Sequence, residues 1–171
     1  ETALLNALAS ASGGAGACDL VLLSGGSSVG RKDILAHVAR REGEILFHGI
    51  ALKPGRPTLL TRLAGATVLG LPGNPTSCLV AAQLLVIPVL RWLAHLPPYE
   101  PVISRLPLGR SLDSPAHMHH VVPVKREGGF ARPVFKASGD ITSLSLADGY
   151  IEIPANVDLV EKGEVVRVVL F

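Results

Sequence analysis

The chain has 171 residues, and its 48% apolar content is enough to bury one compact core or two smaller ones. Its 16 basic and 14 acidic residues give a net charge of +2, without a basic run or a series of stacking aromatic residues. These values exclude a disordered chain and give no sign of nucleic-acid binding.

Regular elements follow one another along the first half of the chain. A helical pattern covers residues 1–11, and it is followed by a strand at 19–24 and a helix at 33–42. The later patterns predict strands at 44–50, 58–63 and 67–71, with a turn at 64–66, and a helix at 75–95. This alternation predicts an α/β domain with flanking helices.

Two of the predicted strands contain continuous apolar runs, "LVLL" at 20–23 and "TVLGL" at 67–71. Such runs are typical of strands that are buried on both faces, as in a mostly parallel sheet. Three prolines in "LPPYEP" at 96–101 then form a stiff spacer. We therefore expect an α/β domain at 1–96 and a small β-barrel or sandwich domain at 97–171.

The second half contains short strand patterns, including "HHVVPVKRE", "FARPVFK", "YIEIP" and "EVVRVVLF". Gly128 and Gly129 separate the first two of these and predict a hairpin turn. No internal repeat or low-complexity tract interrupts the pattern. These features predict an all-β, barrel-like fold for this half.

Three features of the sequence indicate where the protein is located in the cell: its cysteines, its longest apolar stretch and its first residues. Cys18 and Cys78 have neither metal nor disulfide spacing, so we expect reduced thiols in or near the core and a cytoplasmic protein. The apolar stretch 78–93 is interrupted by Pro88 and Arg91, which favours a buried helix over a membrane span. No signal peptide precedes the helical pattern at Glu1, which predicts a fragment of a longer protein.

The stretch "SGGSSVGRKD" at 24–33 joins a predicted strand to a predicted helix. Its glycines allow a tight turn close to a ligand, and its serines and the helix N-terminus offer donors to an anion. A structural turn and a phosphate site are equally compatible with this pattern, which is neither a Walker loop nor a Rossmann fingerprint. The candidate residues are Ser24, Gly25, Gly26, Ser27, Ser28 and Gly30.

Asp33, at the end of this stretch, has two interpretations. It is a good N-cap for the helix that follows. A carboxylate beside a phosphate site is also a ligand for Mg²⁺, which binds one or two carboxylates together with phosphate oxygens. A metal ion would remove the repulsion between the carboxylate and the phosphate.

Two further loops offer similar chemistry. In "LGLPGNPTS", Asn74 and Pro75 suit a helix start, while Pro72 and Gly73 stiffen the backbone beyond what a cap requires and suit a ligand wall. In an open α/β sheet, the first loop and this one would both lie at the carboxyl ends of strands, where ligands bind.

The loop "LKPGRP" at 52–57, which is the second candidate loop in chain order, places Lys53 and Arg56 around a turn. These two cations are either solvated or a pair of clamps for phosphate or another oxyanion. Donors, cations and a carboxylate in three loops favour a common site.

The histidine cluster "HMHH" at 117–120 suggests metal binding only weakly. In a strand, His117 and His119 would face one way and His120 the other, and no third ligand is evident in the sequence.

In their order, "SGGSSVGRKD", "ALKPGRP" and "GLPGNPTS" resemble the molybdopterin molybdenumtransferase family, of the MoeA and gephyrin E-domain type. The later "SGDITSLSLADGYIEIP" resembles the C-terminal β domain of that family, so the likeness covers nearly all of the chain. The resemblance implies an enzyme that inserts molybdate into adenylylated molybdopterin with Mg²⁺ and releases AMP.

The resemblance also implies roles for single residues. Asp33 would bind metal or molybdate, Lys53 would bind an anion, and Pro72 and Pro75 would form a rigid wall. Residues 24–30 would hold a phosphate, and Ser138 would face the cleft. The implied partners are a second copy in a homodimer, the adenylyltransferase and the molybdoenzymes.

Two departures from the family matter. Gly49 stands where the family often has a second lysine, and the upstream domains of the family, with an acidic strand motif, are expected before Glu1. The alternatives are therefore a fragment that is inactive alone, a related molybdopterin adenylyltransferase, or a non-catalytic binding or scaffold module of the same fold.

Overall fold

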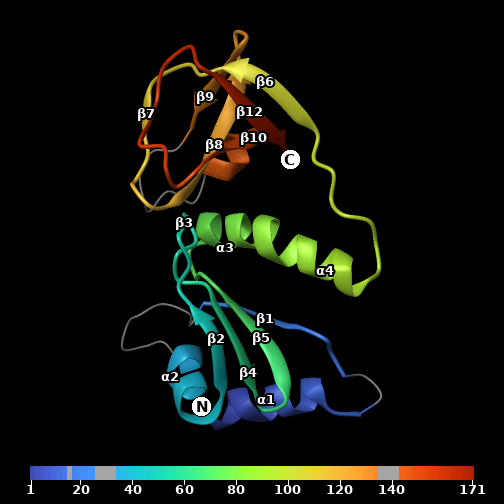
Figure 1. The fold of residues 1–171 in the computed structure, drawn as a ribbon. Helices are drawn as coiled ribbons and strands as arrows, with labels where there is room; N and C mark the ends of the chain where they lie inside the picture. Colours follow the sequence, from blue (N-terminus) through green and yellow to red (C-terminus); the bar gives the residue numbers. More distant parts are fainter. Residues whose placement is uncertain (15–16, 26–33, 135–142) are drawn as a thin grey trace. The chain divides into compact units, whose positions relative to one another are not determined.

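The computed structural model describes residues 1–14, 17–25, 34–134 and 143–171 (Figure 1). The contacts between residues divide the chain into two compact units. The first unit contains Glu1–Ile50 and Gly55–Pro97, and the second contains Ala51–Pro54 and Pro98–Phe171. Four residues from the first half of the chain, 51–54, therefore belong to the second unit.

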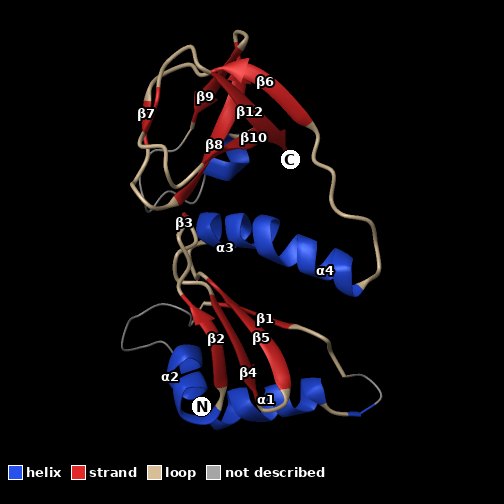
Figure 2. Ribbon diagram, in the orientation of Figure 1, coloured by secondary structure: helices blue, strands red, loops and turns tan. Residues whose placement is uncertain are grey.

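The first unit alternates helices and strands, so the predicted α/β class is confirmed (Figure 2). Its elements, in chain order, are α1 (Thr2–Ser12), β1 (Val21–Ser24), α2 (Ile34–Glu42), β2 (Glu44–His48), β4 (Leu59–Leu63), β5 (Ala66–Leu71), α3 (Pro75–Ala81), the π-helical turn η2 (Ala82–Val86) and α4 (Ile87–Leu93).

The strands of this unit form a mixed sheet in the order β1-β5-β4-β2. Only β1 and β5 pair in parallel among its described strands, whereas β4 pairs antiparallel with both β5 and β2. The prediction of a mostly parallel sheet was therefore wrong. The reason is local: Ala64 and Gly65 both have positive φ angles, 51° and 82°, which form a tight hairpin and reverse the chain between β4 and β5.

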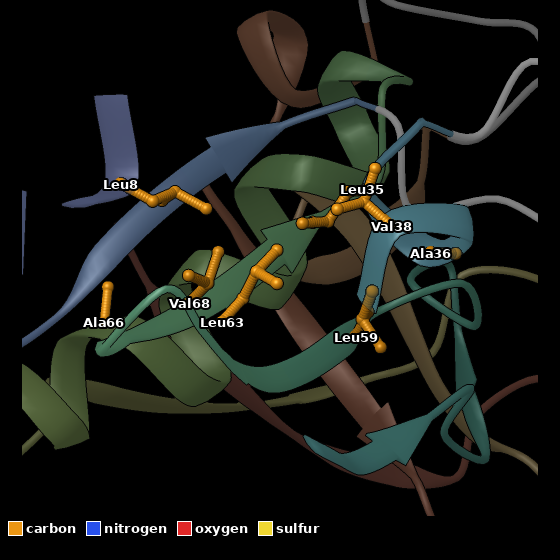
Figure 3. Close-up of a cluster of buried hydrophobic side chains, with 8 residues drawn as sticks. All are labelled: Leu8, Leu35, Ala36, Val38, Leu59, Leu63, Ala66 and Val68. Carbon is orange, nitrogen blue, oxygen red and sulfur yellow. The ribbon is translucent and has the colours of Figure 1, made fainter. Parts of the chain in front are cut away.

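Helices cover both faces of the sheet. Side chains from α1 and α2 pack against β4 and β5 in one buried cluster, whose members are shown in Figure 3: Leu8, Leu35, Ala36, Val38, Leu59, Leu63, Ala66 and Val68. On the other face, Leu69 and Leu71 of β5 pack against Ala81 and Val86 of the long helix. The central position of β5 between two helical layers explains why its run is apolar throughout.

The apolar run of β1 has a different environment. β1 is the terminal strand of the described sheet, its residues alternate between half-buried and exposed, and Leu22 is 42% exposed. Burial of this run on both faces was therefore predicted wrongly. Cys18, just before β1, is also exposed, whereas Cys78 is half-buried beside the second cluster.

One continuous helix, Pro75–Leu93, is long and apolar enough to cross a membrane by length and composition alone. Its middle part, η2, is π-helical, and Pro88 lies directly after η2 in the first turn of α4. Proline has no N–H and its ring displaces the carbonyl four residues earlier, which explains why the regular ladder changes here. The prediction of a buried helix was wrong for the second half of this segment, because α4 contains no buried residue and Trp92 is 75% exposed.

The second unit consists of short strands and one short helix, as the sequence predicts. They are β3 (Leu52–Lys53), β6 (Ile103–Pro107), β7 (Leu112–Asp113), β8 (His119–Glu127), β9 (Phe130–Pro133), the 3₁₀ helix η3 (Ser143–Leu146), β10 (Gly149–Ile153), β11 (Leu159–Val160) and β12 (Val165–Leu170). Gly128 and Gly129 have φ angles of 60° and 80°, so the predicted hairpin between β8 and β9 is confirmed.

Six strands of this unit form one sheet along the path β3-β8-β10-β12-β6, and β9 pairs with the other part of β8. The described strands do not close into a barrel, because the segment after β6 meets β9 only at an isolated bridge between Leu108 and Ala131. The core of this unit consists of Leu108, Val122, Val124, Ala131, Ile151, Ile153, Val160 and Val168.

Candidate functional site

The first candidate loop begins at the end of β1, where Ser24 pairs with Leu71 of β5. The amide of Gly25 donates a hydrogen bond to the carbonyl oxygen of Leu71 at 3.0 Å, and Gly25 has a φ angle of +85°. This left-handed conformation strains any residue with a Cβ atom, so the position requires glycine. The other candidates of this loop, Gly26, Ser27, Ser28, Gly30 and Asp33, lie outside the described residues.

The third candidate loop joins β5 to α3 and starts the helix. The side-chain oxygen Oδ1 of Asn74 accepts hydrogen bonds from the amide of Ser77 at 3.1 Å and from its hydroxyl at 3.2 Å. Asn74 is therefore the N-cap and Pro75 the first helical residue, as the sequence predicts. Pro72 is buried, whereas Gly73 and Pro75 are exposed.

These two loops contact each other. A Cβ atom added to Gly73 would lie 3.5 Å from the Cα atom of Gly25, and the hydroxyl of Ser24 lies 3.7 Å from Sγ of Cys78. The contact follows from the parallel pairing of β1 and β5, because parallel neighbours end at the same edge of a sheet. Gly73 is exposed at this contact, and an anion can approach backbone N–H groups closely where side chains are absent.

The second candidate loop, 52–57, is divided between the two units. Lys53 belongs to β3 of the second unit, where it pairs with His120 of β8. Arg56 belongs to the first unit, where its carbonyl oxygen accepts a hydrogen bond from the amide of Ile50 at 2.9 Å. Both cationic side chains are exposed. Ser138, the candidate of the β domain, lies outside the described residues.

A polar pair between β8 and β10 was not assigned from the sequence. Nε2 of His119 lies 2.8 Å from Oε2 of Glu152, which belongs to the neighbouring strand β10. The pattern "YIEIP" indicates that Glu152 faces outward, but only the pairing of β8 with β10 brings it to His119. As predicted, adjacent histidines differ in exposure: His119 is half-buried and His120 is buried.

His120 has an unusual environment for a histidine. It is 7% exposed, and its Nδ1 atom has no hydrogen-bond partner among the described residues. Burial, followed by the positive charges of Lys53 and His119, lowers the pKa of His120 to about 4. The imidazole is therefore neutral at pH 7.

The described residues contain no group of three side chains of the types that bind metals. Two surface cavities, of about 500 and 480 Å³, also lie away from the candidate loops. The first is lined by residues 116–117, 155–156 and 158, and the second by Asp19, Trp92, Leu93, His95 and Leu96. The candidate site therefore rests on the loops and not on either cavity.

Known proteins resemble this chain along both units. Residues 1–92 match the family described as a probable molybdopterin binding domain. This chain belongs to that family. Residues 105–171 match the MoeA C-terminal region, also called domain IV. The two matches follow one another in the order that the sequence motifs predict, and the resemblance to the molybdopterin molybdenumtransferase family is confirmed.

Two curated relatives of this family member are 30% and 33% identical to it. A molybdopterin molybdenumtransferase of Bacillus subtilis is 30% identical over 164 residues, which cover 89% of this chain and 37% of the relative. A molybdopterin molybdenumtransferase 2 of Mycobacterium tuberculosis is 33% identical over 160 residues, which cover 88% of this chain and 39% of the relative. The chain thus spans less than two fifths of these relatives.

Solved structures of MoeA proteins have a similar fold to this chain. Two solved structures, each described as a MoeA molybdopterin biosynthesis protein from Pyrococcus horikoshii, align with a TM-score of 0.71, at 40% and 28% identity. They cover 89% and 90% of this chain, and 37% and 35% of the solved chains. The mixed α/β unit and the β-rich unit are thus features of the MoeA fold.

Proposed function

We propose that this chain acts in molybdenum cofactor biosynthesis as a molybdopterin molybdenumtransferase, which inserts molybdate into adenylylated molybdopterin and releases AMP. The observation that supports this most is the contact between Gly25 and Gly73 at the shared end of the parallel strands β1 and β5. This contact leaves backbone of two loops at one edge of the sheet, which is where α/β proteins bind phosphorylated ligands.

The phosphate groups of the substrate would lie against the first loop. Ser24 begins it with an exposed side chain, and the amide of Gly25 is already bound to Leu71. Gly26, Ser27, Ser28 and Gly30 would supply N–H and hydroxyl donors. Pro72, Gly73, Asn74 and Pro75 would form the opposite wall. The Asn74 side chain already binds the first turn of α3, so it would hold this wall in position without contacting the ligand.

Mg²⁺ would be held by Asp33, together with phosphate oxygens of the substrate and water. This proposal is compatible with the described residues, which contain no cluster of three metal-binding side chains, because Mg²⁺ commonly uses one or two carboxylates and keeps several waters. When bound, the ion would neutralise charge on the phosphoanhydride.

Lys53 and Arg56 would act on anions. Both side chains are exposed, so they can reach molybdate or phosphate without first losing a buried partner. Cleavage of the anhydride and delivery of the metal to the dithiolene need positioning and charge neutralisation more than a protein nucleophile. Cations and backbone N–H groups are sufficient for this chemistry.

Further proposals follow from membership of the family. We infer a cytoplasmic protein that forms a homodimer and exchanges substrate and product with the adenylyltransferase and with molybdoenzymes. Ser138 of the second unit would face the substrate. Sedimentation velocity of the 171-residue chain tests the dimer: a single species of monomer mass at high concentration would exclude it.

Calorimetric titration of the chain with AMP, adenylylated molybdopterin and molybdate tests the proposed function. We expect binding of the pterin nucleotide and weaker binding of AMP, with Mg²⁺-dependent affinity that Asp33→Asn reduces. Asp19→Asn serves as a matched control, because it removes an acidic residue outside the candidate loops.

The outcomes distinguish the alternatives. Release of AMP in the presence of molybdate supports the proposal. Formation of adenylylated molybdopterin from ATP would instead identify an adenylyltransferase. Failure of the folded chain to bind any of the three ligands would favour a scaffold module and overturn the proposal.

A further inference from the structure

The pairing of β3 with β8 places Lys53 beside His120. The two strands are parallel, and Lys53 and His120 are register partners. Paired residues of neighbouring strands lie on the same face of a sheet, and the strands are about 4.8 Å apart. An ammonium group and an imidazole ring therefore share one edge of this sheet.

His120 enters this pair without a compensating partner. Its ring is buried, and Nδ1 meets no hydrogen-bond partner among the described residues. A buried polar atom without a partner is costly, usually by about 1–3 kcal/mol. Such an atom is compatible with a ring that changes its protonation state or its contacts when a ligand binds.

The groups close to His120 include both positively and negatively charged side chains. Lys53 faces it from β3, and His119 precedes it on β8. From β10, Ile153 is its register partner, and the carboxylate of the adjacent Glu152 lies against His119 at 2.8 Å. Burial, together with the positive charge of Lys53, keeps the ring neutral, because an added proton would be poorly hydrated and would meet a positive field.

We propose that Lys53 and His120 form one subsite for a tetrahedral oxyanion, and that His120 takes up a proton from solvent when a doubly charged anion binds there. This inference rests on the proposed anion-binding role of Lys53. A dianion beside Lys53 reverses the local field from positive to negative. The imidazolium that forms then donates an N–H hydrogen bond to the anion or balances its second charge.

The anion could be free molybdate or the phosphate of the nucleotide, since both are tetrahedral oxyanions. Sulfate is a useful probe because it remains a dianion between pH 4 and pH 8. We would follow the His120 ring signals of the 171-residue chain by NMR from pH 7.5 to pH 4, with and without saturating sulfate. Parallel experiments with AMP distinguish a free oxyanion from a nucleotide phosphate.

The pKa of His120, about 4 in the free protein, is expected to rise by about 2 in the sulfate complex. Sulfate affinity is then expected to increase about tenfold between pH 7 and pH 5, because the complex binds a proton that the free protein lacks. Lys53→Gln is expected to abolish the binding. His119→Gln is the matched control, because it removes the neighbouring histidine and should leave the increase in place.

Separate outcomes overturn the two ideas. If Lys53→Gln binds sulfate, molybdate and AMP as well as the unchanged chain does, the anion-binding role of Lys53 is wrong. If Lys53 is required but the His120 signals titrate identically with and without sulfate, only the proton-linked subsite is wrong. The NMR titration uses the unsubstituted protein, so it gives an answer even if His120→Gln fails to fold.

Discussion

Gly25 and Gly73 face each other across the ends of two parallel strands, and a Cβ atom on Gly73 would lie 3.5 Å from the Cα atom of Gly25. The two positions differ in backbone conformation, since Gly25 alone of the pair has a positive φ angle, +85°. Alanine at position 25 therefore tests the effect of backbone strain. Alanine at position 73 tests whether an added methyl group obstructs the candidate site.

Gly25→Ala is expected to destabilise the chain by about 1–2 kcal/mol, because alanine is strained in the left-handed region. Gly73→Ala adds a methyl group at an ordinary contact distance and should change the free energy of unfolding much less. It should nevertheless weaken binding of AMP, because the methyl group covers backbone at the loop contact. Urea unfolding and calorimetry measure both effects. Unchanged AMP affinity in folded Gly73→Ala would remove this contact from the ligand site.

Asn74 offers a test of the helix cap. Asn74→Ala removes the acceptor of two hydrogen bonds from Ser77 and is expected to destabilise the chain by about 1 kcal/mol. Asn74→Asp retains an oxygen acceptor and should be close to neutral, while Ser77→Ala removes only the hydroxyl donor. Thermal unfolding of the three variants gives the comparison. Equal melting temperatures for Asn74→Ala and the parent chain would mean that the cap contributes nothing.

Gly149 is required by packing in the second unit. A Cβ atom on this residue of β10 would clash with the carbonyl oxygen of Val169 in β12, so the strands would have to separate. Gly149→Ala is expected to cost about 3 kcal/mol or more, at the upper end of overpacking effects. Denaturant unfolding of this variant beside Gly73→Ala provides the check, and a loss below about 1 kcal/mol would contradict the close approach.

The buried His120 makes stability depend on pH. Its pKa is about 4 in the folded chain and about 6.5 in an unfolded one, so the unfolded state binds the proton more readily between these values. Stability from this group is fully present above about pH 6.5 and is lost as the pH falls toward 4. The loss amounts to about 2 kcal/mol at pH 5 and about 3 kcal/mol in total.

Urea unfolding at pH 7, 5.5 and 4.5 measures this dependence, and His120→Gln isolates it from the carboxylates that titrate in the same range. The difference in unfolding free energy between the parent chain and His120→Gln should shrink as the pH falls. His119→Gln is the control, because its side chain is half-buried and lies beside a carboxylate. A difference that stays constant over this range would show that His120 protonates equally in both states.

The sequence predicts well where local chemistry decides the structure. Asn74 and Pro75 begin a helix, and the two glycines at 128–129 form the turn of a hairpin. The meeting of the first and third loops also follows from the sequence, because both were expected at the carboxyl ends of parallel strands.

Features that depend on pairing between distant segments were not predictable in this way. The apolar run of β1 looks the same as that of β5, although one strand is terminal in the described sheet and the other central. The direction of β4 depends on a two-residue turn that contains Ala64, which is not a usual residue at positive φ. The contact between His119 and Glu152 joins residues 33 positions apart and requires the register of β8 with β10.

The short strand β3 has a consequence for dividing this protein into its parts. It lies in the loop between β2 and β4, yet Leu52 is buried and both of its residues pair with β8. A polypeptide that starts at Pro98 would leave one edge of β8 without its neighbour, and an open edge invites pairing with other chains. The sequence boundary at the proline spacer is therefore not a physical boundary. A soluble β unit would need residues 51–54 supplied again, for example as a short fused strand.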